Sequence, residues 1–388
     1  MKIVYYTQTY FLDSDLPLVK KLIEKGNDVY LFIQLVPNTL KSTLVNIDKQ
    51  LPKIDILPVS LYPQFNEYGD FFDKDKTFII NRSCKVYNLK NMLLRIRFHK
   101  ILCCICPDIV LVTEFPKVQD FFLYQFRKNL VQIVHDPTPH TGETTFRKRF
   151  NKWISHHLCN CFVVLSESLK NKYVSSYHLQ NKLVEVNRLG VYECLWHVKP
   201  ETIQKYGKKQ ILFFGRISPY KGIEYLIKAM DIVHRRIPDA ILIIAGGGEL
   251  YFRKSLYEGK DYIKIFNRFL SLEELYGLLK ISDITVCPYT DATQSGVIMT
   301  SYAACVPVLA TRVGGLPEMI LEGKTGELVT PKNTEELARN ILYMIESDVR
   351  LNKYKANVKE AINKGKYSWE VISDKYLEIF RKVLKLQS

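Results

Sequence analysis

The chain has 388 residues, beyond the size at which one hydrophobic core usually stops growing, so two domains are expected. Its 47% hydrophobic and 24% charged residues are ordinary for globular proteins and exclude disordered and coiled-coil classes. Lysine and arginine outnumber aspartate and glutamate by 55 to 40, and the formal net charge of +15 suits an anionic partner: a phosphorylated ligand, a membrane surface or nucleic acid.

In the N-terminal half, short β-rich runs alternate with longer amphipathic segments. We expect strands at 2–7, 28–34, 109–113, 130–135 and 161–165, and helices at 16–25, 90–106, 119–129 and 144–158. This alternation predicts a parallel sheet with crossover helices. The polar stretch 37–76 shows no clear periodicity.

A second unit of the same kind begins near residue 208. We expect strands at 210–214, 240–245, 263–266, 284–287 and 306–310, and helices at 222–237, 271–280 and 296–304. The sequence therefore predicts an α/β protein of two doubly wound Rossmann-like domains, 1–190 and 208–366, with a linker near 190–208. A C-terminal helix, 367–388, can cover either domain. Ligands of such folds bind beyond the carboxyl ends of the strands, and a two-domain protein places its main pocket in the cleft between them.

Cysteine usage and the start of the chain bear on its compartment. The nine cysteines are odd in number, and Met1-Lys2 runs directly into a short apolar segment, so we expect no secretory signal and a cytoplasmic setting. Cys103, Cys104 and Cys106 lie in an apolar run, which favours packed thiols over metal ligands. The sequence has no run of about 18 apolar residues, so we expect no membrane-spanning helix.

The loop GRISPYKG, 215–222, follows one expected strand and precedes a helix. Gly215 allows the backbone to leave the strand closely, and Arg216 and Lys221 place two cations beside a helix N-terminus. Free amides and the helix dipole favour an anion there, for which arginine offers a planar fork and lysine a point charge. A solvated loop is the alternative.

The segment AGGGE, 245–249, follows the next strand. Its glycines, with Gly247 in the middle, permit close approach of a ligand to the backbone, although a plain tight turn is as good an interpretation.

A third loop begins at Pro288 and crowds polar side chains before an apolar helix that Gly296 opens. Asp291, Gln294 and Ser295 can hydrogen-bond a polyol, while the helix aims its first amides at the same place. Capping of the helix by Thr293 or Ser295 is the structural alternative.

In the N-terminal half, the segment VQIVHDPTPHTGE places His135 and Asp136 at the end of a strand. A neutral histidine there can donate a hydrogen bond to a hydroxyl or move a proton, or can be purely structural. Pro137 and Pro139 spoil the helical spacing that a metal site on this segment would use.

Together these loops resemble glycosyltransferase family 4, the retaining nucleotide-sugar transferases of GT-B fold. The resemblance covers about residues 208–330 through GR-x4-KG, IIAGGGE, SLEELYGLLKISDITVCPY and PVLATRVGGLPEMI. In the N-terminal half only HDPTPH is similar, and the glycine pair of the family's first strand–helix loop is replaced by TQTYFLDSDLP.

The resemblance implies that Arg216 and Lys221 bind the donor diphosphate and that His135 approaches the donor sugar. Further donor contacts are implied at Gly215, Gly247, Arg268, Phe269, Asp291, Gln294, Ser295, Gly296, Val297 and Thr300. It also implies a nucleotide-diphosphate-sugar donor, a glycan or lipid-linked acceptor hydroxyl, no metal or other cofactor, and a role in cell-surface polysaccharide biosynthesis.

One departure separates this chain from the family pattern. The two positions where the family has glutamates are Ala292 and Thr300, and neither is acidic. A weak or inactive nucleotide-sugar-binding or scaffold subunit is therefore an alternative. A nucleotide-sugar 2-epimerase is disfavoured, because it would need several carboxylates where this loop has only Asp291.

Two basic segments with interleaved apolar residues suggest peripheral docking on an anionic membrane, at the inner face of the cell membrane. Their cations are Arg82, Lys85, Arg95, Arg97, Arg147, Lys148 and Arg149. A solvated helix face is the equal alternative, and nucleic acid is disfavoured because no nucleic-acid-binding signature accompanies the charge.

Overall fold

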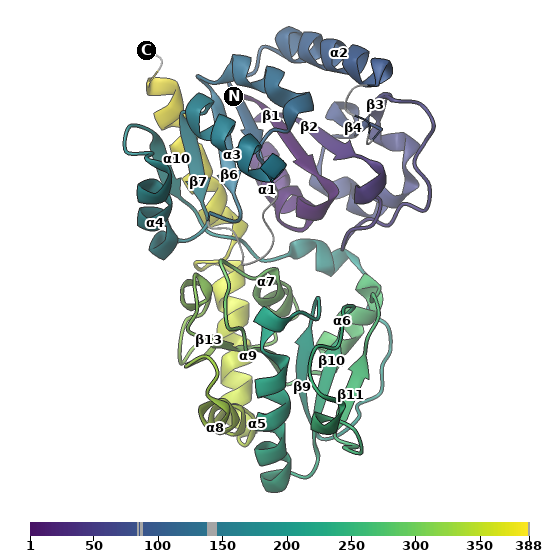
Figure 1. Cartoon of the computed structure of the whole chain (residues 1–388), viewed down its shortest axis with the longest axis vertical. Helices are drawn as coiled ribbons and strands as arrows, with labels where there is room; N and C mark the ends of the chain where they lie inside the picture. The colour runs from purple at the N-terminus through teal and green to yellow at the C-terminus, as the bar shows by residue number, and fades with distance from the viewer. Residues whose placement is uncertain (84, 86–87, 138–145, 387–388) are drawn as a thin grey trace. The chain divides into compact units, whose positions relative to one another are not determined.

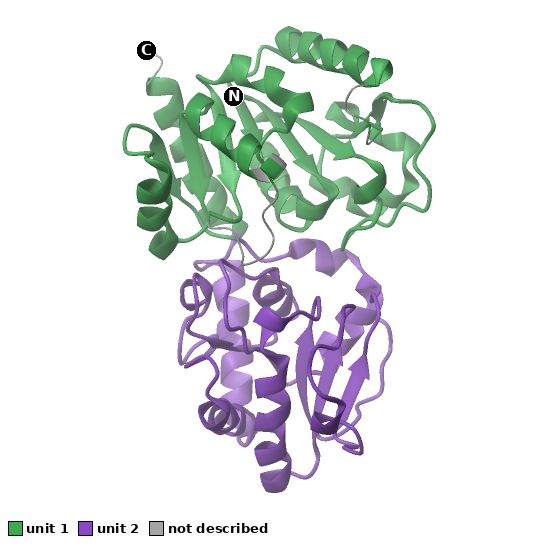
Figure 2. Ribbon diagram, in the orientation of Figure 1, with its two compact units in different colours: residues 1–189, 369–388 green, residues 190–368 purple. Residues whose placement is uncertain are grey.

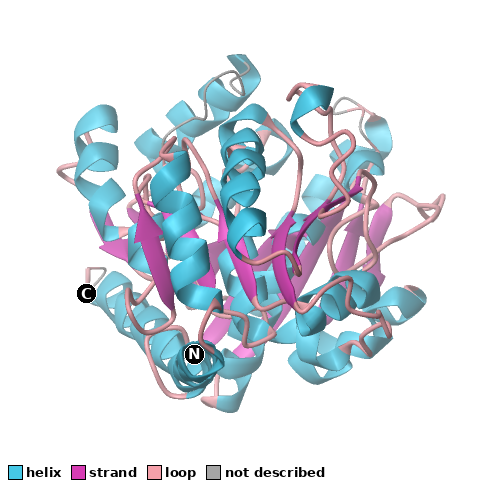
Figure 3. Ribbon diagram, turned by 90° about the horizontal axis from the view of Figure 1, so that it is seen from below, coloured by secondary structure: helices cyan, strands magenta, loops and turns pink. Residues whose placement is uncertain are grey.

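The computed structural model describes residues 1–83, 85, 88–137 and 146–386 (Figure 1). The chain divides into two compact units (Figure 2): unit 1 comprises residues 1–189 and 369–388, and unit 2 comprises residues 190–368. Both are built on largely parallel sheets, and helices lie on both sides of the strands (Figure 3). The predicted fold class, two Rossmann-like α/β domains, is confirmed.

Unit 1 contains an eight-stranded sheet in the order β3-β4-β2-β1-β5-β6-β7-β8, parallel except for the β3–β4 pair. Its strands are β1 (Lys2–Gln8), β2 (Asp28–Leu35), β3 (Asp55–Pro58), β4 (Thr77–Asn81), β5 (Ile109–Val112), β6 (Leu130–Val134), β7 (Cys161–Val164) and β8 (Leu183–Val186). The chain leaves β1 toward β2 and later returns to its other side as β5. The carboxyl ends of β1, β5 and β6 are therefore neighbours at the topological switch point.

The helices of unit 1 are α1 (Leu12–Glu24), α2 (Leu89–Ile105), α3 (Phe146–Leu158), α4 (Glu167–Tyr177) and α10 (Trp369–Lys385). Short 3-10 segments are η1 (Thr9–Phe11), η2 (Pro37–Thr39), η3 (Val59–Leu61), η4 (Pro63–Phe71), η5 (Lys74–Lys76) and η6 (Val118–Phe126). The aperiodic stretch 37–76 thus consists largely of 3-10 turns around one edge strand.

Helix α10 packs on unit 1, which settles which domain the C-terminal helix covers. It lies against α1, where Lys25 Nζ is 2.6 Å from a carboxylate oxygen of Glu370. The Asn187 side-chain amide also donates to the backbone carbonyl of Ile372 at 3.0 Å. Buried apolar residues recur along one face of α10, so it supplies part of the core of unit 1.

Unit 2 contains a six-stranded parallel sheet in the order β11-β10-β9-β12-β13-β14. Its strands are β9 (Lys209–Phe214), β10 (Ala240–Ala245), β11 (Ile263–Phe266), β12 (Ile284–Cys287), β13 (Val308–Thr311) and β14 (Gly326–Val329). Its helices are α5 (Ile223–Arg236), α6 (Leu272–Ile281), α7 (Gly296–Ala303), α8 (Thr334–Ile345) and α9 (Asp348–Asn363), with 3-10 segments η7 (Glu193–His197), η8 (Pro219–Lys221), η9 (Lys254–Leu256) and η10 (Leu316–Met319).

One expected helix is wrong. Residues 119–129 form the 3-10 segment η6 and the start of a loop rather than an α-helix. The segment is rich in aromatic residues, which are middling helix formers. Asp120 within it is 1% exposed and is bound to Arg82, and this tertiary contact fixes the local backbone where propensity does not.

Candidate functional site

The switch point of unit 2 lies between β9 and β12, so the loops after these two strands border the same place. Gly215 leaves β9 with φ +109°, a conformation that side chains rarely adopt. A Cβ atom there would lie 3.5 Å from Val297 Cγ2, so the β9 loop meets the first turn of α7. The structure thereby brings together two segments that the sequence placed 80 residues apart.

Lys221 is the buried cation of this edge. It is 9% exposed, and its Nζ lies 3.7 Å from the ring centre of Tyr289 and 5.0 Å from that of Tyr220. Burial, together with the positive charge of Arg216, lowers the pKa of Lys221 to about 8. Arg216 itself is exposed. A buried ammonium held between aromatic rings is poorly hydrated and gains strongly from an anionic ligand.

The glycines after β10 pack backbone against backbone. Gly246 has φ +146°, and a Cβ on it would lie 2.0 Å from the carbonyl oxygen of Gly215. A Cβ on Gly247 would lie 3.7 Å from the backbone nitrogen of Phe269. The triple glycine therefore connects the β9 loop with the segment after β11.

Arg268 and Phe269 follow β11. The Arg268 guanidinium binds Glu274, with Nη1 2.7 Å from a carboxylate oxygen, and Phe269 is exposed. Because the arginine side chain is engaged with Glu274, a ligand beside Gly247 would meet mainly the backbone of this segment.

Helix α7 begins beside Gly215. Ser295 occupies its N-cap position but makes no side-chain capping bond; its hydroxyl instead lies 3.2 Å from the Tyr289 hydroxyl. The capping alternative from the sequence is therefore not realised by the Ser295 side chain. The first amides of α7 lack acceptors within the helix and point toward its N-terminal end, where an anion is favoured.

The two positions that lack the family's glutamates are built into the wall of unit 2. Ala292 is 4% exposed, and Gly314 packs directly on its carbonyl oxygen. Thr300 is 7% exposed, and its hydroxyl donates to the Gly296 carbonyl at 3.0 Å. Asp291 is exposed, and Gln294, like Thr290, is half-buried, so these polar side chains of the loop remain accessible.

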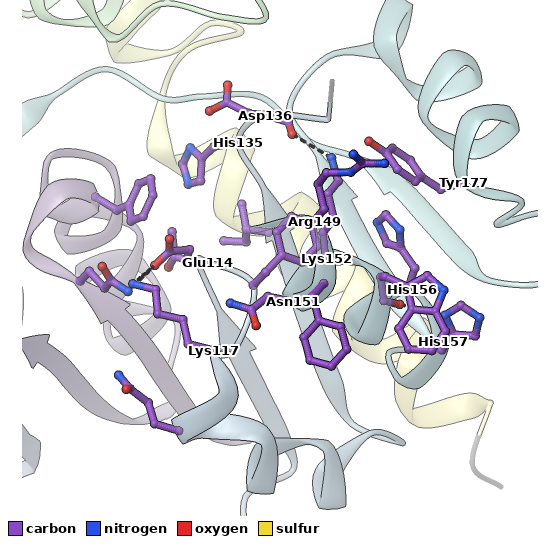
Figure 4. A pocket seen from close by; sticks show the side chains of 18 of the residues that line it. Glu114, Lys117, His135, Asp136, Arg149, Asn151, Lys152, His156, His157 and Tyr177 are labelled. Atoms are coloured by element: carbon purple, nitrogen blue, oxygen red, sulfur yellow. Dashed lines mark hydrogen bonds and ion pairs between the residues drawn. The ribbon is translucent and has the colours of Figure 1, made fainter. Parts of the chain in front are cut away.

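Unit 1 has a cavity of about 1850 Å³ at the carboxyl ends of β1, β5 and β6, bordered along one side by helix α3 (Figure 4). We call it the α3 cavity. His135, directly after β6, lines it, and its ring stacks on Phe11 with the centroids 4.4 Å apart. Burial lowers the pKa of His135 to about 4, although the charge of Asp136 opposes the shift. The imidazole is therefore neutral at pH 7, as expected for a hydrogen-bonding partner of a hydroxyl.

Lys152 is a site residue that the sequence did not single out for this edge. Its Nζ donates to the Pro137 carbonyl at 2.8 Å and lies 4.4 Å from the ring centre of Tyr177. Burial lowers the pKa of Lys152 to about 8. Figure 4 shows it beneath the turn that follows His135. In the sequence, Lys152 is one of several cations in the segment FRKRFNKW, 146–153, and nothing distinguishes it from the others of a basic helix face.

Glu114 and Lys117 also line the cavity, with Lys117 Nζ 3.2 Å from the Glu114 carboxylate. The Gln8 side-chain amide donates to Glu114 and, at 2.9 Å, to Gln34. Gln8 is the last residue of β1, and Glu114 and Lys117 follow β5, so their place at the end of a strand was the available signal. The segment 138–145, which includes the second half of HDPTPH, lies outside the described residues.

The predicted basic surface is partly wrong. Arg82 is 1% exposed and paired with Asp120 at 2.8 Å, because the segment after β4 turns its guanidinium into the core of unit 1. Arg149 lines the α3 cavity, and the side chains of Arg147 and Lys148 lie outside the described part of the structure. The other three cations do lie toward the outside: Lys85 and Arg97 are exposed and Arg95 is half-buried.

The described residues contain neither a candidate metal centre nor a candidate membrane-spanning helix. No group of three His, Cys, Asp or Glu side chains in the described ranges stands where it could hold a metal ion. Within the same ranges, no helix combines the length and apolarity needed to cross a bilayer.

Part of the chain matches a known family model. Residues 198–363 match the family model "Glycosyl transferases group 1". An uncharacterized glycosyltransferase of Methanocaldococcus jannaschii is 30% identical over 237 residues, which cover 58% of this chain and 60% of that protein. A GDP-mannose-dependent alpha-(1-6)-phosphatidylinositol monomannoside mannosyltransferase of Mycolicibacterium smegmatis is 34% identical over 139 residues, covering 32% and 36%. The matches thus span 60% and 36% of the length of these two relatives.

The fold is shared more widely than the sequence. The structure of HepE from Anabaena in complex with UDP superposes with a TM-score of 0.68, covering 98% of this chain and 100% of that chain at 14% identity. At this identity the likeness shows the fold alone.

Proposed function

We propose, from the membership of residues 198–363 in the glycosyl transferases group 1, that this chain moves a sugar from a nucleotide-diphosphate sugar to an acceptor hydroxyl with retention. The observation that carries the proposal is the arrangement at the switch point of unit 2. There the buried Lys221, the exposed Arg216 and the start of α7 converge on one edge that is otherwise backbone. The acceptor is a glycan or lipid-linked molecule of cell-surface polysaccharide biosynthesis.

Each part of this edge has a chemical role in the proposal. Arg216 and Lys221 bind the diphosphate, and the first amides of α7 add partial positive charge as the leaving group becomes more negative. Gly247 leaves room for the nucleoside beside the backbone of Arg268 and Phe269, while Asp291 and Gln294 hydrogen-bond the sugar. Arg216, Lys221 and the first amides of α7 compensate the diphosphate charge without a metal ion or other cofactor.

The chemical step requires no protein nucleophile. The acceptor oxygen bonds to the anomeric carbon on the face that the diphosphate leaves, and the acceptor proton passes to the departing phosphate oxygen. The neutral His135 hydrogen-bonds the transferred sugar. Catalysis then rests on positioning and on stabilisation of the leaving charge, so the absence of acid at Ala292 and Thr300 does not remove it.

Thermal unfolding with UDP-, GDP-, ADP- and CMP-sugars tests donor binding. A ligand at ~100 times its dissociation constant stabilises by about 2.7 kcal/mol, which is a clear shift in the unfolding temperature. We expect one nucleotide to give this shift, Arg216→Ala and Lys221→Ala to abolish it, and Arg339→Ala, an exposed arginine on α8, to preserve it. Failure of every nucleotide sugar to shift the transition would overturn the proposal.

A non-catalytic subunit that binds nucleotide sugars is a second candidate. It is favoured by Thr300, because the Thr300 hydroxyl donates to the Gly296 carbonyl within its own helix. A glutamate at this position would have a carboxylate for a donor hydroxyl. Release of nucleoside diphosphate from the donor that binds separates the two candidates. Binding with release, enhanced by an acceptor extract, supports the transferase; binding without release supports the subunit.

Helix α2 supports a further element of the proposal, peripheral docking on anionic lipid. Its inner side buries Leu94, Phe98 and Leu102, while its outer side exposes Leu89, Met92, Leu93 and Ile96, each by about half or more. The exposed residues follow the i, i+3, i+4, i+7 spacing of one helix face. The helix also carries four Lys or Arg and no acidic residue, and each such cation contributes ~1 kcal/mol at an anionic surface.

Sedimentation with vesicles tests this docking. We expect binding to phosphatidylcholine vesicles that contain phosphatidylglycerol, loss of binding in Leu93→Glu/Ile96→Glu, and no change in Val349→Glu, which alters an equally exposed residue of unit 2. Equal sedimentation of all three proteins would contradict docking through α2.

A further inference from the structure

Helix α3 buries several polar side chains and exposes three aromatic ones, which is unusual for a helix at a protein surface. Its buried side chains include Asn151, Ser155 and His156, of which Ser155 bonds the Tyr124 hydroxyl and His156 bonds the Tyr173 hydroxyl at 2.7 Å. Its exposed side chains include three large aromatic ones, beside Arg149 and His157. A helix normally buries its apolar face, so aromatic residues kept out of the core have a use outside it.

The exposed aromatics form one continuous row. Phe146, Phe150 and Trp153 are 84%, 40% and 56% exposed, and all three line the α3 cavity. The rings of Phe146 and Phe150 are 6.5 Å apart and tilted by 13°; those of Phe150 and Trp153 are 6.2 Å apart and tilted by 20°. The backbone rise between Phe146 and Trp153 is ~10 Å, so the row is an extended apolar strip rather than a single binding point.

Polar groups accompany the row. His157 packs on Trp153 at 4.3 Å between centroids and donates from Nδ1 to the Trp153 carbonyl, which leaves Nε2 as the acceptor of the neutral ring. Arg149 and Asn181 line the same cavity. Flat apolar rings flanked by side-chain donors and acceptors match a pyranose chain, which presents C–H faces to aromatic rings and hydroxyls at its edges.

The size of the cavity argues for more than one sugar. Its volume of about 1850 Å³ exceeds the ~300–1,000 Å³ typical of sites for one small molecule. It extends from His135 along α3 to residues at the end of α4. A chain with its terminal hydroxyl at His135 would have its preceding units beside the aromatic row.

We propose that Phe146, Phe150 and Trp153 form a stacking track for an oligosaccharide acceptor, so that this protein extends an existing glycan chain rather than glycosylating a single sugar or a bare lipid. The inference rests on the proposed function for the identity of the bound chain as acceptor. The track itself is a glycan-binding site whether or not transfer follows.

Binding in the absence of donor tests the track. The probes are glucan, mannan and galactan oligosaccharides from monosaccharide to hexasaccharide, with farnesyl phosphate as the lipid probe. Trp153 reports binding through its fluorescence in a Trp196→Phe background, because Trp369, the remaining tryptophan, is buried. Calorimetry measures binding to variants that lack Trp153.

We expect at least one sugar series in which affinity rises about tenfold from monosaccharide to trisaccharide. Trp153→Ala and Phe150→Ala should each weaken trisaccharide binding by about two- to tenfold, with the monosaccharide unchanged, and Trp153→Phe should retain most of the affinity. Tyr343→Ala, which removes an exposed ring of unit 2, should change nothing.

Two results would overturn the track: no series with length-dependent affinity, or tighter binding of farnesyl phosphate that Trp153→Ala abolishes. The nucleotide-sugar experiment has a separate readout. A length-dependent glycan affinity without any donor response would leave the track standing and remove the transferase proposal, and the reverse result would do the opposite.

Discussion

The carboxyl edges of the two units are built by different means. In unit 2 the edge is mostly backbone: glycines after β9 and β10 press on each other, and α7 contributes its first amides. In unit 1 the edge is mostly side chains, with Lys152 beneath the turn after His135 and Glu114 joined to Gln8 and Lys117. A backbone site is constrained to a few residue types at fixed spacing, whereas a side-chain site can be assembled from many sequences.

The largest expected loss of stability lies in the core of unit 1. Arg82→Met leaves the buried Asp120 carboxylate without its partner, which should cost about 3–5 kcal/mol of unfolding free energy. Arg97→Met removes an exposed cation from Asp55, which keeps Lys53 at 3.0 Å, and should cost at most ~1 kcal/mol. Urea unfolding measures both, and equal losses would show that unit 1 does not depend on its buried charge pair.

Backbone packing in unit 2 is probed by Gly246→Ala. The new Cβ would meet the Gly215 carbonyl at 2.0 Å in a backbone conformation unsuited to alanine, so we expect a loss of about 3 kcal/mol in unfolding free energy together with the donor response. Gly259→Ala is the control: it also has a positive φ but no atom within 4 Å, and should cost ~1 kcal/mol. Similar losses for both would mean that strain, and not the close approach, determines the glycine.

Buried acids make unit 1 sensitive to pH. Burial raises the pKa of Asp15 to about 6, although hydrogen bonds from Thr7 and Thr113 oppose the shift. The folded state therefore holds this proton more tightly than the unfolded state, and the stabilisation present below about pH 4 is lost as the pH rises through 6. Asp15→Asn should flatten the pH profile and gain roughly 1–3 kcal/mol at pH 7.

Chemical unfolding from pH 4 to 8 measures that difference. Asp70→Asn, an exposed carboxylate, is the control and should follow the unmodified protein. A parallel profile for Asp15→Asn would locate the pH dependence elsewhere.

The smallest expected effect is the pH dependence of donor binding by Lys221 in unit 2. Because the pKa of Lys221 is about 8, the cation that binds the diphosphate is lost above that pH, and donor affinity should fall by up to about tenfold per pH unit. The stability of the protein without ligand should change in the opposite direction, since the unfolded lysine binds its proton more tightly. Lys221→Arg should keep any affinity it has constant to pH 10; a decline as steep as in the unmodified protein would exclude Lys221 as the titrating group.

The sequence predicted unit 2 better than unit 1 for the same reason that their edges differ. The bounds of β10, β11 and β12 agree with the expected segments because each is a short apolar run ended by glycine, proline or a polar turn. Gly215, Gly247 and Val297 do lie together because backbone contacts of this kind leave glycine in the sequence. Arg82 was misassigned because a buried arginine and a surface arginine look alike until its partner, 38 residues away, is known.

Unit 1 receives its last helix from beyond unit 2, and this determines the order in which the chain can fold during synthesis. All of residues 190–368 leave the ribosome before α10 does, so unit 2 can complete its sheet while the face of α1 that α10 covers still awaits it. Domains generally fold in order from the N-terminus as they emerge. Here the unit that is begun first is completed only after unit 2 has emerged, and the apolar face of α1 stays uncovered until α10 follows.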